Sequence, residues 1–399
     1  MNKLKNFLRF VFNIEYIIIA FIALGLLSVG CLIVVNISFL NPISESVREF
    51  SITDVFYEIE NSQNTQETSP LISIVDITDI HAREDIGEVL VNIAMCEPKV
   101  LGIDLIFEGV KDNLVGNEVL KESVTMLPEN TIFAAKLIDY DSSAKEFTSV
   151  VRSFFAEELG VKEGFVNLCD NFAAAKIREM STQQVLLGKH YDSFAVRLCE
   201  LCGINVGDKG PEQNRLINYK NVDFVTIPAD SVLDYSQYLK DRIVLLGTMR
   251  EEADMHSTPV GKMPGIKIFA YKLLTLLERQ KVVEAGGWML VAIAILYCWI
   301  LEVCICGIYI YMRKKKNGLC RLLSDTDLIR DIIIISSLLF LYWLLFVLFV
   351  TYNIIVEGMV VFGCIAMLPT AIEIYDKIVN LLYDRYKWEW LRKFSKFIL

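Results

Sequence analysis

The sequence predicts an extracytoplasmic α/β domain joined to four transmembrane α-helices. Three observations support this fold class: four long apolar blocks, the positions of lysine and arginine around them, and an alternation of short apolar runs with helical patterns between the first two blocks. Such alternation predicts a mixed, mostly parallel sheet with helices on both faces.

Four apolar blocks are long enough to span a membrane. They are residues 16–40, 288–312, 332–351 and 353–372. Each meets the roughly 20 residues that a helix needs to cross the hydrocarbon core. Helices in a soluble core are rarely apolar on every face for this length, so we expect transmembrane helices. The first block is longer than a signal-peptide core and lacks a small-x-small cleavage site, which favours an uncleaved anchor.

Basic residues predict the orientation of these spans. Lysines and arginines occur in the N-terminal segment 1–15, in the basic linker 313–331 and in the tail 373–399. The turn between the third and fourth blocks has none. Because cytoplasmic loops carry the excess of lysine and arginine, we expect both termini inside and residues 41–287 outside.

The predicted external segment is strongly acidic. Residues 41–287 contain 24 Lys+Arg against 39 Asp+Glu. This balance argues against nucleic acid as a partner and against docking of this segment on anionic lipid. The sequence also lacks the G-x-G-x-x-G and G-x-x-x-x-G-K-[ST] phosphate-binding patterns, and we expect no cofactor. Small ligands, cations and protein partners stay open.

The external segment begins with a helical pattern at 44–60, expected as a stalk, and a polar loop at 61–70. Apolar β-branched runs then alternate with helical spacing, which predicts a βαβαβ unit. Its expected strands are 71–77, 99–107 and 131–138, and its helices are 84–96 and 117–127. Later segments are expected as strands at 164–168, 215–219 and 242–248, and as helices at 193–203, 228–239 and 266–280.

Several stretches resemble the type-2 CHASE domain, a cyclase- and histidine-kinase-associated sensory extracellular domain of bacteria. They are "ISIVDI" (72–77), "EPKVLGIDLIFEG" (97–109), "INY" (217–219), "DRIVLLGT" (241–248) and "DMHSTPVGKMPGIKIFAYKLLTLL" (254–277). The layout is also similar, with one membrane helix before the domain and three after it. The resemblance implies a sensory input module in a bacterial inner membrane. Since only 27 residues follow the fourth block, we expect the output to come from a separate polypeptide.

Two aspartates come near the ends of predicted parallel strands. Asp76 ends the first strand and Asp104 lies within the second. Ligands of doubly wound sheets lie beyond the carboxyl ends of the strands, so both are candidates for ligand binding. The alternative is structural: such aspartates often cap a helix or accept hydrogen bonds from loop amides.

The stretch "ADMHSTPVGKMPG" follows the last predicted strand of the domain. Asp254, His256 and Thr258 are candidate ligand-binding residues, and the acid and imidazole could also form a proton-transfer pair. No G-x-S-x-G or H-E-x-x-H pattern supports hydrolysis, so we expect neither catalytic residues nor a metal site. The prolines and glycines favour a turn-rich crossover, and Pro264 and Gly265 are candidates for coupling the domain to the next helix.

Four cysteines are expected outside: Cys96, Cys169, Cys199 and Cys202. The C-x-x-C pair lies near the end of a helical pattern, whereas a redox thiolate is favoured at a helix N-terminus. We therefore expect structural thiols, buried or partly oxidised.

Glu302 is a charge in the middle of the second span, where charges are costly and commonly functional. We expect it to be protonated, to pair with Ser336 or Ser337, or to face a partner helix. It is a further coupling candidate.

The predicted function is sensory: an unknown extracytoplasmic ligand would bias the membrane helices, which would signal to a separate cytoplasmic or membrane partner. The basic aromatic tail fits either an interfacial helix on membrane lipid or a docking helix. A homodimer stays open. The alternatives are a membrane scaffold subunit of an envelope complex, which senses nothing, and an extracytoplasmic hydrolase using Asp254 and His256.

Overall fold

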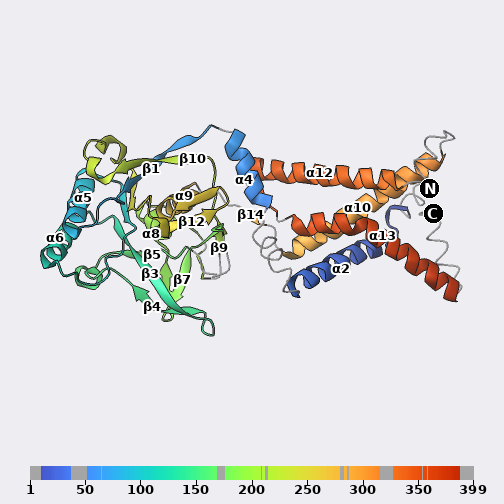
Figure 1. Ribbon diagram of the computed structural model, residues 1–399, viewed down its shortest axis with the longest axis horizontal. Coiled ribbons are helices and arrows are strands. Elements are labelled where there is room, and N and C mark those ends of the chain that lie inside the picture. The colour runs from blue at the N-terminus through green and yellow to red at the C-terminus, as the bar shows by residue number, and fades with distance from the viewer. Residues whose placement is uncertain are drawn as a thin grey trace. The chain divides into compact units, whose positions relative to one another are not determined.

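The computed structural model describes residues 10–36, 52–63, 65–168, 176–207, 209–211, 214–278, 283–284, 287–314, 327–352, 354–356 and 358–386. The chain divides into two compact units, drawn in Figure 1. One unit comprises Met1–Thr53 with Val283–Leu399, and the other comprises Asp54–Val282.

The second unit is built on a sheet whose central strands are parallel. The strand order is β10-β1-β11-β2-β3-β4-β7-β8, and β5 also pairs with β3. The pairs from β10 to β3, and β3 with β5, are parallel. These strands are β1 (Glu67–Asp76), β2 (Val100–Ile103), β3 (Thr131–Asp141), β5 (Glu163–Phe165), β10 (Val222–Pro228) and β11 (Ile243–Gly247). The mixed, mostly parallel sheet of the sequence prediction is therefore confirmed.

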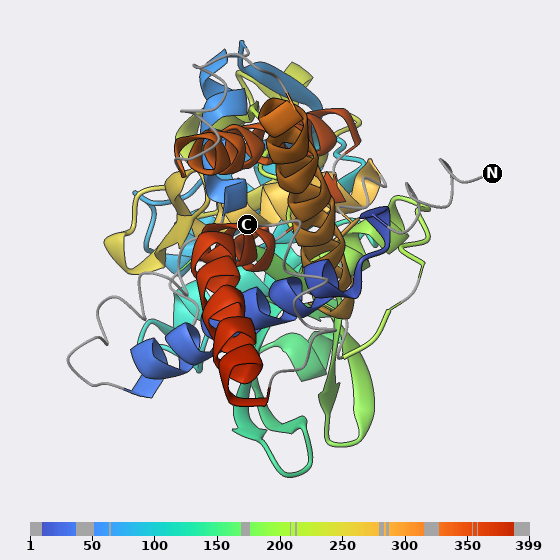
Figure 2. The ribbon, with the colours of Figure 1, turned by 90° about the vertical axis from the view of Figure 1, so that its right-hand side faces the viewer.

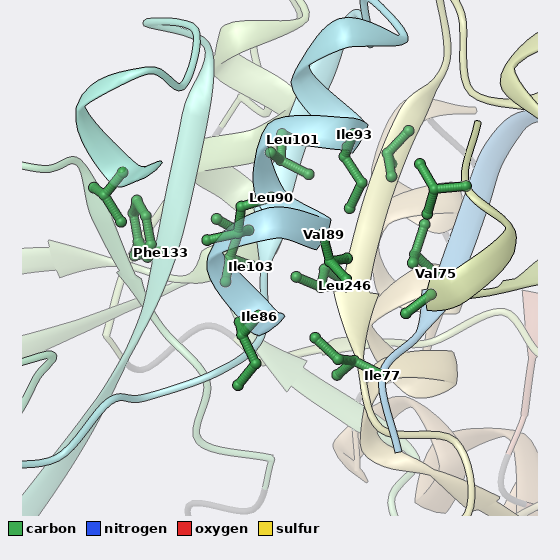
Figure 3. Packing of buried hydrophobic residues seen from close by; sticks show 14 of the residues in the cluster. Val75, Ile77, Ile86, Val89, Leu90, Ile93, Leu101, Ile103, Phe133 and Leu246 are labelled. Carbon is green, nitrogen blue, oxygen red and sulfur yellow. The ribbon is translucent and has the colours of Figure 1, made fainter. Parts of the chain in front are cut away.

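Helices cover both faces of this sheet. On one face, α5 (Arg83–Met95) packs beside α6 (Leu114–Thr125), and α5 directs Ile86, Leu90 and Ile93 toward the strands (Figure 3). On the other face lie α8 (Phe194–Leu201) and α9 (Gly265–Leu277). Alternate strand residues serve the two faces, so almost every side chain of β2 and β11 is buried.

The far side of the sheet contains two antiparallel hairpins joined by a parallel β4–β7 pair and is more exposed. There β3 forms a hairpin with β4 (Glu146–Val151), and β7 (Gln183–Leu186) forms one with β8 (Lys189–Asp192). The remaining elements are α4 (Ile52–Gln63), α7 (Ala156–Leu159), and the pair β6 (Glu179–Ser181) and β9 (Asn214–Leu216).

Several predicted elements differ from the structure. The second strand ends at Ile103, so Asp104 follows the strand and is not within it. Residues 228–239 form two short 3-10 turns, Ala229–Ser231 and Ser236–Tyr238, and not one helix. The expected loop at 61–70 is divided between the end of α4 and the start of β1. The first two differences arise where a short apolar pattern fits more than one element, and the third is a shift of element ends into a polar stretch.

The turn-rich crossover after β11 contains more regular structure than predicted. A turn, Glu252–Asp254, leads into a hairpin of β12 (Met255–Thr258) and β13 (Gly261–Pro264). The turn of this hairpin includes Gly261, whose φ of 108° favours glycine. The prolines and glycines thus close a hairpin immediately before α9.

The first unit contains four helices that could cross a membrane by length and composition. They are α2 (Ile14–Asn36), α10 (Gly287–Lys314), α12 (Leu328–Tyr352) and α13 (Met359–Tyr386). Figure 2 shows α2 in dark blue crossing α13 in red, and these two helices pack against each other and against α10. Short strands β14 (Val283–Glu284) and β15 (Ile354–Ile355) also pair. The four predicted membrane helices are confirmed as candidate spans, and α13 continues well beyond the predicted 353–372.

Some predictions fall on segments outside the described residues. They concern residues 44–51 of the stalk, Cys169, most of the basic linker at 315–326, and the basic tail at 387–399.

Candidate functional site

The site begins at the carboxyl end of β2, where Asp104 follows Ile103. Its backbone N–H donates to the carbonyl of Leu246 in β11 at 2.8 Å, which fixes the residue beside that strand. Its side chain is partly buried. The position is the strand-end edge at which ligands of parallel sheets bind.

Asp254 lies in the segment that follows β11, and its side chain connects this segment to the start of α9 by a hydrogen bond. Its Oδ2 accepts a hydrogen bond from the Gly265 N–H at 3.1 Å, and its Oδ1 lies 3.3 Å from His256 Nε2. Both side chains are about one-third exposed. A carboxylate that lies beside the first N–H group of a helix also interacts favourably with the helix dipole. One carboxylate therefore connects the imidazole to the N-terminus of α9.

Lys272 supplies a buried positive charge from α9. Its side chain is 3% exposed, and its ammonium lies 4.8 Å from the centre of the Phe269 ring. The ammonium is close enough to Asp104 to favour ionisation of that carboxyl. We call Asp104, Asp254, His256 and Lys272 the rim cluster.

The rim cluster gives Asp104 unusual acid–base behaviour. Burial and the nearby Asp254 carboxylate raise the pKa of Asp104 to about 7, although Lys272 and His256 act in the opposite direction. A carboxyl with this pKa exchanges its proton near neutral pH, where an ordinary aspartate is fully ionised. The protonation of Asp104 can therefore change when a small charge is added or removed nearby.

Asp76 lies on the other side of β11, where groups from the loop after β1 and from the chain after β11 bind its carboxylate. Its Oδ1 accepts hydrogen bonds from the N–H groups of Thr78 and Met249 at 3.0 and 3.2 Å and from the Thr78 hydroxyl. Arg250 Nε lies 3.3 Å from Oδ2. Burial alone would raise the pKa of Asp76, but these hydrogen bonds and the Arg250 charge together lower it. This geometry is that of the structural alternative, in which the aspartate fixes a loop.

Thr258 and Pro264 also have structural positions. The buried Thr258 hydroxyl donates to the Gly261 carbonyl at 2.6 Å and accepts from Val260 N–H, so it closes the β12–β13 hairpin. Pro264 ends β13 in an extended conformation immediately before α9. Gly265 begins that helix, and a Cβ there would lie 2.7 Å from Asp254 Oδ1.

The external cysteines that the structure describes are free thiols. Cys96 and Cys199 are buried, and Cys202 is partly buried. Burial raises the pKa of each of these thiols, which disfavours the reactive thiolate. Their environment is that of packing residues.

Glu302 belongs to the other unit and is 2% exposed within the helix bundle. The Ser337 hydroxyl, one of its expected partners, instead donates to the Tyr297 hydroxyl at 3.1 Å. The carboxyls that interact with Glu302 are those of Asp376 and Glu15, from α13 and α2. Glu302 is therefore covered by the helices of its own bundle.

The described residues contain no group of three His, Cys, Asp or Glu side chains arranged to hold a metal ion. A hollow of about 530 Å³ lies elsewhere on the same unit and is lined by Tyr140, Ala144, Lys145, Gln184, Val185, Gly210 and Pro211. None of the rim-cluster residues lines this hollow. The rim cluster and this hollow are therefore separate.

The sequence analysis named Asp104, Asp254 and His256 as candidates but missed Lys272, which also interacts with Asp104. A signal was available, because a lysine stands inside the apolar run "IKIFAYKLLTLL". A charge on the buried face of a helix commonly has a partner in the core. Its partner could not be read from the sequence, because Asp104 is far away in the chain.

A family model described as the CHASE2 domain matches residues 26–309. The match covers more than half of the 399 residues, so the chain belongs to the CHASE2 family. This is a family of sensory extracellular domains, and the chain is accordingly a multi-pass membrane protein with a sensory domain. No curated protein and no solved structure matches the chain.

Proposed function

We propose that this CHASE2 protein binds a small extracytoplasmic ligand at the rim cluster and signals through its membrane helices to a separate partner. One observation carries the proposal: Asp254 bonds both His256 and the first N–H of α9, while interacting with the titratable Asp104. A ligand that moves or neutralises Asp254 therefore acts directly on the start of a helix.

The accessible part of the rim cluster is acidic. Asp104, Asp254 and His256 are all partly exposed, so two carboxyls and one imidazole are accessible, whereas the positive charge of Lys272 is buried. A small cation such as an amine would replace the proton of Asp104 and pair with both carboxylates. We infer that the ligand is a small cation of this kind and that no catalytic step follows its binding.

The route from the rim cluster to the membrane is short in sequence. Helix α9 ends at Leu277 and α10 begins at Gly287. A change in the direction or stability of α9 would therefore be transmitted to the second membrane span. The ligand can drive this change only if it binds two conformations of the domain with different affinities.

The proposed topology has the sensory domain outside the cytoplasmic membrane of a bacterium and both termini inside. The basic residues near the predicted inner ends of the helices support it. Protease added to intact spheroplasts should cut the exposed turn at 141–145 and spare a tag at the C-terminus. Protection of the turn together with loss of the tag would overturn this orientation.

A thermal-shift screen of the full chain in detergent tests the ligand. Small amines and divalent cations should be compared on the wild type, His256→Ala and Asp254→Asn, with exposed His81→Ala as the matched control. A true ligand raises the melting temperature of the wild type and of the control but not of the two site variants. Equal stabilisation of all four proteins would contradict the site. If no probe binds and assembly with an envelope protein is retained, the scaffold role is favoured.

A further inference from the structure

Three carboxyl groups from three different helices of the bundle lie near enough to interact electrostatically. They are Glu15 of α2, Glu302 of α10 and Asp376 of α13, and each pair interacts electrostatically. Glu15 is 3% exposed and Glu302 is 2% exposed, whereas Asp376 is partly buried. We call these three residues the membrane acid cluster.

The polar groups around the membrane acid cluster come from the same three helices. Asn13 Nδ2 donates to Glu15 Oε2 at 3.0 Å, and the Tyr375 hydroxyl also bonds Glu15. Tyr16 and Cys306 bond each other beside the carboxyls. Among the residues that the structure describes, no lysine or arginine forms an ion pair or an electrostatic contact with the three carboxyls.

Two of the carboxyls have an oxygen with no partner. Glu302 Oε1 and Asp376 Oδ1 are buried, and neither forms a hydrogen bond with the described part of the chain. A buried carboxylate without a hydrogen bond or a counter-charge costs several kcal/mol, on the order of the penalty for breaking a buried ion pair. Ionisation of all three carboxyls would also place like charges near one another, and these would repel. The arrangement therefore favours neutralisation of the carboxyl charge.

We propose that the membrane acid cluster is a proton-binding site inside the bundle, and that its proton occupancy controls how α2, α10 and α13 pack together. Neighbouring carboxyls in an apolar bundle are costly to ionise together, and a bound proton removes the uncompensated charge from a carboxyl whose oxygen has no hydrogen-bond donor. A proton fits better than a metal ion, because the described carboxyls are not arranged as a three-ligand metal site.

The site joins the helices on which signalling would depend. In the sequence α2 precedes the sensory domain and α10 follows it, while α13 leads to the C-terminal segment. Loss of protons would place like charges on all three helices and weaken their packing. The site is independent of any ligand at the rim cluster and does not rest on the proposed function.

Infrared spectroscopy of the full chain tests the proposal directly. In a maltoside detergent, which carries no carbonyl group, the wild type should show the carbonyl band of a protonated carboxylic acid at neutral pH. The band should persist in Asp104→Asn, which removes the sensory-domain carboxyl that titrates near pH 7, and the variants below are made in that background. Glu302→Gln should lose this band in part or whole, and Glu373→Gln, which changes an exposed carboxyl one turn before Asp376, should keep it. Absence of the band in the wild type, or its full retention in Glu302→Gln, would overturn the proposal.

A second measurement covers the case in which Glu302→Gln folds poorly. Asp104→Asn removes the pH dependence that the sensory domain contributes near pH 7, so the comparison is made in that background. There the melting temperature should still fall as the pH is raised above neutral, because ionisation places unpaired charge in the apolar site of the bundle. Glu302→Gln or Asp376→Asn should lose most of this fall, and Glu373→Gln should keep it. If sodium, potassium, magnesium or calcium chloride removes the fall where choline chloride does not, the ligand is a metal cation and the proton is excluded.

Discussion

Asp76 and Asp104 lie on opposite sides of β11 at the same edge of one sheet, yet their environments differ completely. Asp76 accepts hydrogen bonds from Thr78 and Met249 and is close to Arg250, and its pKa is lowered. Asp104 faces Asp254, and its pKa is raised to about 7. The same residue type at equivalent strand ends therefore closes a loop at one position and forms a titratable site at the other.

The difference comes from what each following segment supplies. The loop after β1 and the chain after β11 point N–H donors at Asp76, which stabilises its ionised form. Among the described residues, no such N–H group donates to the Asp104 carboxyl. The nearby group is instead a second carboxylate, that of Asp254. Loop chemistry, more than position at the strand end, determines which aspartate is available for a ligand.

The largest expected effect is the pH dependence that Asp104 gives to the sensory domain. A raised pKa means that the folded state binds the proton more tightly, so this contribution to stability is full below about pH 4 and is lost as the pH rises through about 7. The loss amounts to up to about 4 kcal/mol for a difference of three pKa units. Asp104→Asn should abolish it. Hydrogen exchange of β2 and β11 peptides, corrected for intrinsic rates, measures the effect.

The outcome that would contradict this prediction is an unchanged pH dependence. If hydrogen-exchange protection of β2 and β11 depends on pH as strongly in Asp104→Asn as in the wild type, another group titrates. Asp112→Asn, which changes an exposed aspartate away from the rim cluster, is the control and should keep the wild-type profile.

Asp76→Ala should have the second largest effect and the opposite dependence on pH. The substitution removes the acceptor of the Thr78 N–H and hydroxyl, one of the two acceptors of the Met249 N–H, and one of the two carboxylates beside Arg250, which should cost about 2–3 kcal/mol at neutral pH. Because the pKa of Asp76 is lowered, this stabilisation persists through the neutral range and disappears only as the solution becomes acidic, below the usual pKa of aspartate. Faster hydrogen exchange at residues 76–79 measures it.

The matched control for Asp76→Ala is Asp79→Ala, which removes an exposed carboxylate that pairs with the same arginine. Its expected cost is below about 1 kcal/mol, because exposed ion pairs contribute little. Equal effects of the two substitutions would mean that Asp76 does not organise the loop.

Gly265→Ala should have the smallest effect on stability and a clearer one on the rim cluster. The added Cβ would lie 2.7 Å from Asp254 Oδ1, so the carboxylate must move away from His256 and from the start of α9. The lost hydrogen bond costs about 1 kcal/mol, partly offset by the better helix propensity of alanine. The apparent pKa of Asp104 should fall, because Asp254 contributes to raising it.

The titration of the Asp104 carboxyl by infrared difference spectroscopy measures this shift. An unchanged titration in Gly265→Ala would separate the start of α9 from the rim cluster and remove the mechanical basis of the proposed signalling.

Much of the fold could be predicted because it depends on local pattern. The βαβαβ unit follows from short apolar runs and helical spacing, and the four spans follow from uninterrupted apolar length. The placement of Asp76, Asp104 and Asp254 at one edge followed from the parallel strands alone. The hairpin before α9 and the 3-10 turns at 229–238 were missed because turn chemistry and short apolar runs do not specify a single element.

The sequence by itself determined the CHASE2-like order of elements, the membrane spans and the acidic character of the external segment. Only the tertiary structure placed β11 between β1 and β2, brought Lys272 to Asp104, and joined Glu302 to Glu15 and Asp376. The physical reason is that periodicity records which face of an element is buried, whereas the partner on that face depends on long-range packing. Both proposed sites, the rim cluster and the membrane acid cluster, consist of charged residues that such long-range packing brings together.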